Sequence, residues 1–154
     1  MKSLQGKIAL VTGGGRDIGK AVSLALAAEG ASLCINYFDN KEQANETLEL
    51  IKKAGGNAIL SQGDMTKEAE VKRVIKDCTD AFGSSIHILV NVAGGLLGRK
   101  TMDDLDEAFW DAVINVNLKS VYLVTRAVLP YMSSGAVVIN FSSQAARDGG
   151  GFGA

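Results

Sequence analysis

The stretch Lys7-Ile8-Ala9-Leu10-Val11-Thr12-Gly13-Gly14-Gly15-Arg16-Asp17-Ile18-Gly19 decides the fold of this chain. An apolar run typical of a buried strand leads into a glycine-rich turn, and a segment of helical period begins directly after it. Such a turn places free backbone N–H groups and the positive end of a helix dipole where a pyrophosphate can bind. The alternative is a tight turn without a ligand, but its position at the first strand-to-helix junction favours a phosphate site.

Short apolar runs and longer helical segments alternate along the rest of the chain. The predicted strands are Ile8 to Thr12, Ala31 to Asn36, Ala58 to Gln62, Ile86 to Asn91 and Ala136 to Phe141. The predicted helices are 18–29, 41–54, 67–82 and 103–132, the last of them broken around residues 112–117 and ended near Pro130. This order predicts an α/β fold with a doubly wound parallel sheet, the Rossmann fold, and a buried fifth strand. No linker or internal repeat divides the chain, so residues 1–154 are treated as one piece.

The composition favours a soluble globular protein. Hydrophobic residues make up 47% of the chain, and the net charge of -1 argues against nucleic acid as the main partner. The N-terminus has no signal-peptide pattern, and no stretch approaches the roughly 20 apolar residues of a membrane span, so a cytoplasmic location is expected. The two cysteines, Cys34 and Cys78, are too few and too widely separated to indicate a disulfide scaffold or a metal site. Reduced structural thiols are expected instead.

The glycine turn resembles that of the short-chain dehydrogenase/reductase family, which reads Thr-Gly-x-x-x-Gly-x-Gly. In this chain Asp17 stands in the place of the middle glycine. We interpret Asp17 as a cap that accepts N–H bonds in the first turn of the helix and points away from the phosphates, with weakened cofactor binding as the alternative. The resemblance implies an NAD(P) site formed in this turn by Gly13, Gly15, Arg16, Asp17, Ile18 and Gly19.

The choice between NAD and NADP depends on the end of the second strand. An NAD site usually has an acidic residue there. By resemblance the acid would align with Tyr37, which is not acidic, although Asp39 keeps NAD open. NADP is favoured because, by resemblance, Arg16 faces the adenosine 2′-phosphate, and Asn36 with Lys41 could add a hydrogen bond and charge.

The segment after the third strand is expected to reach the adenine. By resemblance, Asp64 meets the adenine amino group, with Met65 beside it. The alternative role for Asp64 is a helix cap, which Thr66 could provide instead.

The fourth strand ends in Asn91-Val92-Ala93-Gly94, which resembles the family's Asn-Asn-Ala-Gly with Val92 in place of the second asparagine. By resemblance, Asn91, Ala93 and Gly94 stabilise the centre of the sheet and pass the nicotinamide ribose. We expect the valine to have little effect, because backbone carbonyls matter there as much as side chains.

Two residues are catalytic by resemblance, Asn117 and Ser143. Asn117 lies in Asn115-Val116-Asn117-Leu118, which resembles a family segment where the helix is interrupted and an asparagine carbonyl holds a water. The hydroxyl of Ser143 would donate to the substrate carbonyl oxygen and stabilise negative charge as hydride arrives at carbon. The alternative for Ser143 is a capping or turn serine.

The general acid of the family is a tyrosine in a Tyr-x-x-x-Lys helix that follows the serine, at positions beyond Ala154. We expect none of the chain's own tyrosines, Tyr37, Tyr122 and Tyr131, to substitute for it. The 154 residues are read as truncated before that motif, within the glycine-rich tail 148–154, and are expected to be inactive by themselves. An uncovered strand edge is expected to make them poorly stable.

The resemblance implies hydride transfer between the nicotinamide and a carbonyl or secondary alcohol, in a homodimer or homotetramer. Members similar to 3-oxoacyl-[acyl-carrier-protein] reductases are favoured, with a 3-oxoacyl thioester as substrate. A non-catalytic nucleotide-binding regulator or scaffold on the same fold is the alternative, supported by Asp17 and the missing Tyr-Lys pair. A methyltransferase-type fold is disfavoured, because the ordered positions of Asn91, Asn117 and Ser143 would then be coincidence.

Overall fold

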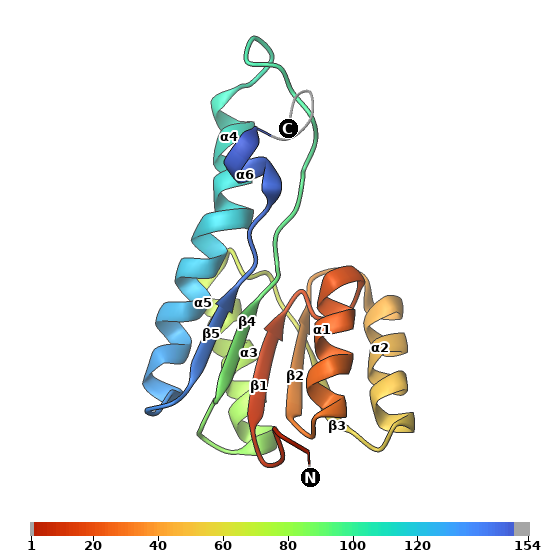
Figure 1. Ribbon diagram of the computed structural model, residues 1–154. Coiled ribbons are helices and arrows are strands. Elements are labelled where there is room, and N and C mark those ends of the chain that lie inside the picture. Colours follow the sequence, from red (N-terminus) through yellow and green to blue (C-terminus); the bar gives the residue numbers. More distant parts are fainter. Residues whose placement is uncertain (1, 150–154) are drawn as a thin grey trace.

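Five parallel strands form one sheet in the order β3-β2-β1-β4-β5 (Figure 1). The computed structural model describes residues 2–149, so all but the start of the predicted glycine-rich tail lies outside the described residues. The strands are β1 (Ile8–Thr12), β2 (Ser32–Tyr37), β3 (Asn57–Gln62), β4 (Ile88–Asn91) and β5 (Val137–Asn140). The strand order reverses between β1 and β4, and doubly wound folds bind ligands outside the carboxyl ends of strands at such a point.

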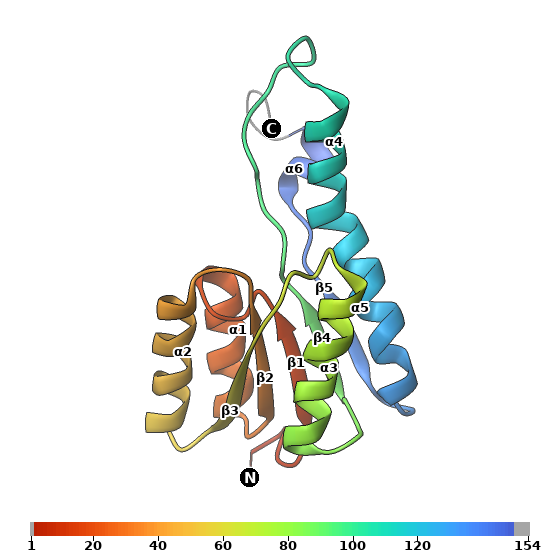
Figure 2. The ribbon, with the colours of Figure 1, turned by 180° about the vertical axis from the view of Figure 1, so that it is seen from behind.

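Helices cover the two faces of the sheet (Figures 1 and 2). On one face lie α1 (Asp17–Ala28) and α2 (Lys41–Lys53), and on the other α3 (Glu68–Phe82) and α5 (Ser120–Val128). The remaining helical elements are α4 (Glu107–Ile114), the π-helical turn η1 (Asn115–Lys119), the 3-10 turn η2 (Leu129–Tyr131) and the short α6 (Gln144–Asp148). The predicted doubly wound α/β fold is confirmed. The break predicted around residues 112–117 is not a gap, because the helix continues there through the π-helical turn η1.

The core has two layers, one on each face of the sheet. Successive residues of a strand point to opposite faces, so Leu10 joins the layer under α3 and α5 while Val11 joins the layer under α1 and α2. Both residues are fully buried. Because both faces of β1, β2 and β4 are covered, these strands are continuous apolar runs rather than alternating ones.

Most element boundaries differ from the prediction by only one or two residues. The largest difference is the long helix, which begins at Glu107 and not at residue 103. The carboxylate of Asp106 accepts the backbone N–H of Phe109 at 2.7 Å and so fixes the first turn there. Strand β4 begins at Ile88, because the N–H of Ile86 donates to the carbonyl of Tyr131, outside the sheet. The short helix α6 was not predicted.

The expectation of a buried fifth strand is wrong. Val137, Val138 and Ile139 of β5 are 37–48% exposed, on both faces of the sheet. The physical reason is position, since β5 is an edge strand that pairs only with β4 among the described residues. The apolar sequence of β5 is therefore that of a central strand, while its place is that of an edge.

The helical rod Glu107–Tyr131 is long and apolar enough to cross a membrane by length and composition alone. The prediction that no stretch approaches a membrane span is therefore wrong as far as composition goes. Within this fold the α5 part of the rod is a core helix, because Val124 and Val128 are at most 1% exposed and pack in the layer with α3. The α4 part projects beyond the carboxyl ends of the strands, beside α6 (Figures 1 and 2).

Candidate functional site

A cleft of about 590 Å³ lies at the carboxyl ends of β1, β2, β3 and β4, which is a typical size for a cofactor site. The structure brings together there most of the predicted site residues. Those that line the cleft are Gly13, Gly15, Arg16, Asp17, Ile18, Gly19, Asn36, Asp64, Met65, Ala93 and Gly94. Three predicted residues do not line it: Asn91, Asn117 and Ser143.

None of the four glycines of the turn has ordinary space for a Cβ atom, and at Gly19 and Gly13 the crowding atoms are backbone atoms. A Cβ atom on Gly19 would lie 2.0 Å from the carbonyl oxygen of Gly13. Gly13 itself has a φ of +62°, and a Cβ there would lie 3.0 Å from the backbone nitrogen of Ala93. The approach of α1 to the end of β1 therefore requires glycine at position 19, while the positive φ and the nearby segment after β4 require it at position 13.

The backbone groups of the turn divide into braced carbonyls and free amides. The carbonyl of Gly14 accepts the hydroxyl of Ser23 at 3.0 Å, and that of Gly15 accepts the hydroxyl of Thr47 at 2.7 Å. The N–H groups of Ile18 and Gly19, which border the cleft, have no hydrogen-bond partner within residues 2–149. Unpaired amides at a helix N-terminus fit the pyrophosphate of a dinucleotide.

Asp17 does not cap helix α1, so the predicted capping role is wrong. The N-cap residue is Arg16, without a side-chain cap bond, and the Asp17 carboxylate is exposed with Oδ2 3.7 Å from Nε of Arg16. The reason is the backbone, because Asp17 has a φ of 49°. Among residues 2–149 it is the only residue other than glycine with a positive φ. Aspartate enters this left-handed region more readily than most residues, which explains how it replaces a glycine here.

Replacement of Asp17 by glycine is expected to stabilise the folded chain by about 1 kcal/mol, because glycine adopts a φ of 49° without steric cost. Chemical denaturation of the cofactor-free protein measures this change. Asp17→Asn is the matched control, since asparagine also tolerates the left-handed region but removes the charge. A gain from Asn equal to that from Gly would assign the effect to the carboxylate and contradict the backbone explanation.

The cleft beyond the end of β2 contains only part of the predicted NADP determinants. Arg16 and Asp39 line it, whereas Lys41 does not. Asn36 reaches it, yet this residue is 1% exposed and its amide is bonded to backbone groups. The expected direct contact of Asn36 and Lys41 with a 2′-phosphate is therefore not supported by their positions, while that of Arg16 is.

Tyr37 has a lysine four positions later, Lys41, which is the spacing of the family's catalytic pair. The structure places the two residues on different elements, since Tyr37 ends β2 and Lys41 begins α2 after a turn. Tyr37 is also 9% exposed. The two residues therefore do not form a Tyr-x-x-x-Lys pair on one helix, and the expectation that no tyrosine of the chain acts as the general acid stays a prediction.

Asp64 folds back on the turn that follows β3 rather than capping α3. Its Oδ1 accepts the N–H and the hydroxyl of Thr66 at 2.9 and 2.7 Å, and the N-cap of α3 is Lys67, without a side-chain cap bond. Partial burial raises the pKa of Asp64, but these hydrogen bonds and the nearby Lys67 outweigh it, so the pKa lies below its usual value. Asp64 is therefore a carboxylate at the cleft that can still accept a hydrogen bond from an adenine amino group.

Thr12 holds the segment after β4 in place. Its buried hydroxyl oxygen accepts the N–H groups of Val92 and Ala93, both at 3.1 Å. Both bonds use backbone amides, so they do not depend on the side chain at position 92. Sequence reasoning missed this role of Thr12, although the residue is part of the glycine-turn motif.

Asn91 lies beneath the cleft, in the sheet. Its Nδ2 donates to Asn140 at 2.9 Å and to Thr125 at 3.2 Å, which joins β4 to β5 and to α5. Its Oδ1 is buried without a partner among the described residues. Asn91 therefore stabilises the junction of β4 with β5 and α5 rather than the centre of the sheet.

Asn117 lies in the π-helical turn and contacts the segment after β4. Its amide donates to the carbonyl of Gly95 at 3.0 Å and accepts the N–H of Gly95 at 2.9 Å. A π-helical turn interrupts the regular backbone pattern and occurs frequently at functional sites. The side chain of Asn117 thus fixes one rim of the cleft, since Gly95 lines it.

Ser143 is the N-cap of α6, and its Oγ accepts the N–H of Ala145 at 3.2 Å. The alternative that the sequence left open, a capping serine, is therefore observed. Capping uses a lone pair of the oxygen and leaves the hydroxyl hydrogen free to donate. The cap and the predicted catalytic role are compatible.

Cys34 and Cys78 lie together in the core, although they are 44 positions apart in the sequence (78 minus 34). Both are buried free thiols. A hydrogen bond with Cys78, burial and the negative charge of Asp77 raise the pKa of Cys34. Their burial in the core agrees with a structural role, and the expectation that they stay reduced remains a prediction.

Comparison with known proteins agrees with the fold. Residues 7–154 match the family model of the short chain dehydrogenases. The hydroxynaphthalene reductase-like protein Arp2 of Metarhizium anisopliae is 36% identical over 149 residues, which cover 97% of this chain and 55% of Arp2. Sequence and fold together define an α/β domain of the doubly wound type. The chain belongs to the short-chain dehydrogenase family.

Two solved structures show the same likeness. The NADH-dependent reductase A1-R′ complexed with NAD is 36% identical, with a TM-score of 0.91 over 99% of this chain and 66% of the reductase. A short chain dehydrogenase from Burkholderia cenocepacia J2315 in complex with NADP is 35% identical, with a TM-score of 0.90 over 97% of this chain and 60% of that one. The chain spans about half the length of the curated relatives it matches.

Proposed function

We propose that this chain is the cofactor-binding part of an NAD(P)-dependent oxidoreductase that transfers hydride between the nicotinamide and a carbonyl or secondary alcohol. The observation that carries the proposal is the glycine turn, where the unpaired amides of Ile18 and Gly19 border a cleft at the switch point of the sheet. Solved relatives hold NAD or NADP. Titration of the chain with NADPH or NADH, followed by nicotinamide fluorescence, tests the proposal, and no binding of either would refute it.

The residues of this chain bind and orient, while the nicotinamide supplies the hydride chemistry when bound. The amides of the glycine turn hold the pyrophosphate, and the Asp64 carboxylate accepts from the adenine amino group. The free hydroxyl hydrogen of Ser143 donates to the substrate carbonyl oxygen, which stabilises the negative charge that develops there. The general acid is proposed to come from residues beyond position 154, so the 154-residue chain alone is expected to show no turnover.

The proposed preference for NADP depends on Arg16, the cation of the turn that lines the cleft. Arg16→Ala is expected to raise the Kd for NADPH about tenfold and to leave the Kd for NADH unchanged, because only NADPH carries the 2′-phosphate. Lys41→Ala is the matched control and should change neither value, since Lys41 lies outside the cleft. An equal loss for both cofactors would contradict the assignment.

A 3-oxoacyl thioester, free or linked to acyl carrier protein, is the proposed substrate class. The family membership supports a small carbonyl substrate, and the resemblance to 3-oxoacyl-carrier-protein reductases supports the narrower choice. The test uses a chain that contains the Tyr-x-x-x-Lys motif and compares the rate of loss of NADPH absorbance with 3-oxoacyl thioesters and with simple ketones. A faster rate with the thioesters is expected.

A cytoplasmic location is also proposed, and the two buried free thiols support it.

A homodimer or homotetramer is proposed from an apolar stripe along the helical rod. The stripe is formed by residues four positions apart that are 36–63% exposed, namely Trp110, Ile114, Leu118 and Tyr122. A charge in the middle of such a stripe opposes its burial against a second copy. Leu118→Glu is therefore expected to halve the mass measured by light scattering or to reduce it further, and an unchanged mass would contradict this interface.

A further inference from the structure

Asn36 connects the two sides of the cleft that the adenosine would occupy. It lies near the end of β2 and is 1% exposed. Its Oδ1 accepts the N–H of Gly13 at 3.3 Å, and its own carbonyl accepts the N–H of Gly14 at 2.9 Å. Asn36 therefore holds two successive amides of the glycine turn.

The other end of the same amide holds strand β3. Nδ2 of Asn36 donates to the carbonyl of Ser61 at 3.2 Å and to that of Gly63 at 3.1 Å. Gly63 directly precedes Asp64, which borders the cleft. A single side chain thus joins the phosphate-binding turn to the segment expected to meet the adenine.

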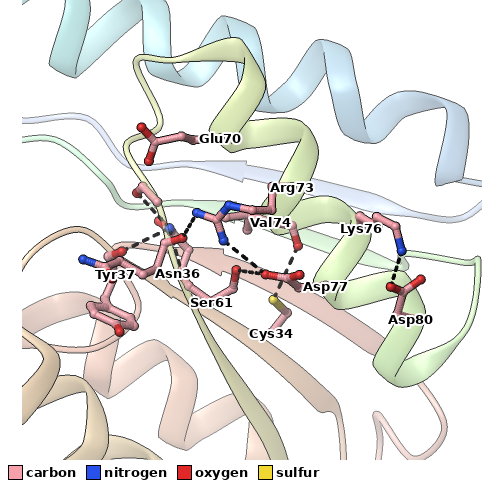
Figure 3. A network of polar contacts seen from close by, with 12 residues as sticks. Cys34, Asn36, Tyr37, Ser61, Glu70, Arg73, Val74, Lys76, Asp77 and Asp80 are labelled. Carbon is pink, nitrogen blue, oxygen red and sulfur yellow. Dashed lines mark hydrogen bonds and ion pairs between the residues drawn. The ribbon is translucent and has the colours of Figure 1, made fainter.

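Helix α3 braces the far side of this connection (Figure 3). The hydroxyl of Ser61 donates to Asp77 at 2.6 Å, and Arg73 contacts both Asp77 and the carbonyl of Gln62. Glu70 accepts the N–H of Asp64 at 2.8 Å. The end of β3 is therefore fixed to α3 on one side and to Asn36 on the other.

We infer that Asn36 is a positioning residue that fixes the glycine turn relative to the segment 63–65 and thereby sets the shape of the adenosine half of the cleft. The inference rests on the proposed function. Asn36 acts through backbone groups, because its buried amide donates to the carbonyls of Ser61 and Gly63 and accepts the N–H of Gly13. Its role thus differs from a direct contact with the cofactor.

Two variants separate the two ends of the Asn36 amide. Asn36→Ala removes both ends. Asn36→Asp keeps an acceptor for the N–H of Gly13 but turns a carboxylate oxygen toward the carbonyls of Ser61 and Gly63. Both variants are expected to raise the Kd for NADPH about tenfold, since each loses the bonds that hold β3.

Hydrogen exchange of individual amides, followed by NMR without cofactor, gives a second readout. Exchange of the Gly13 amide should become at least tenfold faster in Asn36→Ala and stay slow in Asn36→Asp. Ser61→Ala is the matched control, because it removes the bond to Asp77 but keeps the carbonyl that Asn36 uses. It is expected to lower the melting temperature while the Kd for NADPH stays within twofold.

The outcomes are distinguishable. If the unaltered chain binds NADPH and the Kd is unchanged in either Asn36 variant, or if Ser61→Ala raises it equally, the inference is overturned and the proposed function stands. If the unaltered chain binds neither NADPH nor NADH, the proposed function fails, and the inference with it. If Asn36→Ala does not fold, Asn36→Asp decides through its Kd and the slow exchange of Gly13.

Discussion

Replacement of Gly19 by alanine is expected to destabilise the domain by about 3 kcal/mol and to weaken NADPH binding at least tenfold. The added Cβ would lie 2.0 Å from the carbonyl oxygen of Gly13 and 2.8 Å from the Cα atom of Gly14. These are backbone atoms, which cannot move away as the end of a flexible side chain can. The first turn of α1 must therefore shift from the end of β1, and the free amides of Ile18 and Gly19 shift with it.

Gly98→Ala is the matched control for this substitution. A Cβ atom on Gly98 would be at ordinary contact distance, 3.5 Å from the Phe109 ring, and Gly98 does not line the cleft. Its unfolding free energy and its Kd for NADPH should stay close to those of the unaltered chain. Urea denaturation and fluorescence titration measure both quantities. A Gly19→Ala variant that matches Gly98→Ala in stability would show that the turn is not as tight as the structure has it.

The parts of the fold that follow from local patterns could be predicted from the sequence. The glycine turn at 13–19 and the alternation of apolar strands with helices after it predict the doubly wound sheet, and the structure agrees with this prediction. The exposure of β5 could not be predicted in this way. Its apolar sequence is that of a central strand, whereas exposure depends on which neighbours are present in space.

The residues that support the cleft leave weaker signals than the residues that line it. Thr47 is one polar residue on an amphipathic helix, and only the packing of α2 shows that its hydroxyl reaches the carbonyl of Gly15. Asn36 was expected to face the cofactor, because the sequence gives its position at a strand end but not the direction of its amide. Tyr37 and Lys41 have the spacing of the Tyr-x-x-x-Lys motif but lie on a strand and a helix. Spacing alone therefore does not identify a catalytic pair.

Thr12→Val is expected to destabilise the domain by about 3 kcal/mol, although the two side chains have nearly the same shape. The hydroxyl of Thr12 accepts two backbone N–H groups, those of Val92 and Ala93, and the residue is fully buried. Valine would leave both amides without a partner, and an unsatisfied buried donor costs about 1–3 kcal/mol. The comparison of isosteric residues isolates this cost, because hardly any cavity forms.

Thr12→Ser is the control that keeps the hydroxyl and removes only a methyl group, at an expected cost of about 1 kcal/mol. The two variants should also differ in function, because Ala93 and the segment around it line the cleft. Thr12→Val is expected to raise the Kd for NADPH severalfold, whereas Thr12→Ser leaves it unchanged. If serine destabilises as much as valine, the methyl contact and not the pair of hydrogen bonds holds this segment, and the role assigned to the Thr12 hydroxyl is wrong.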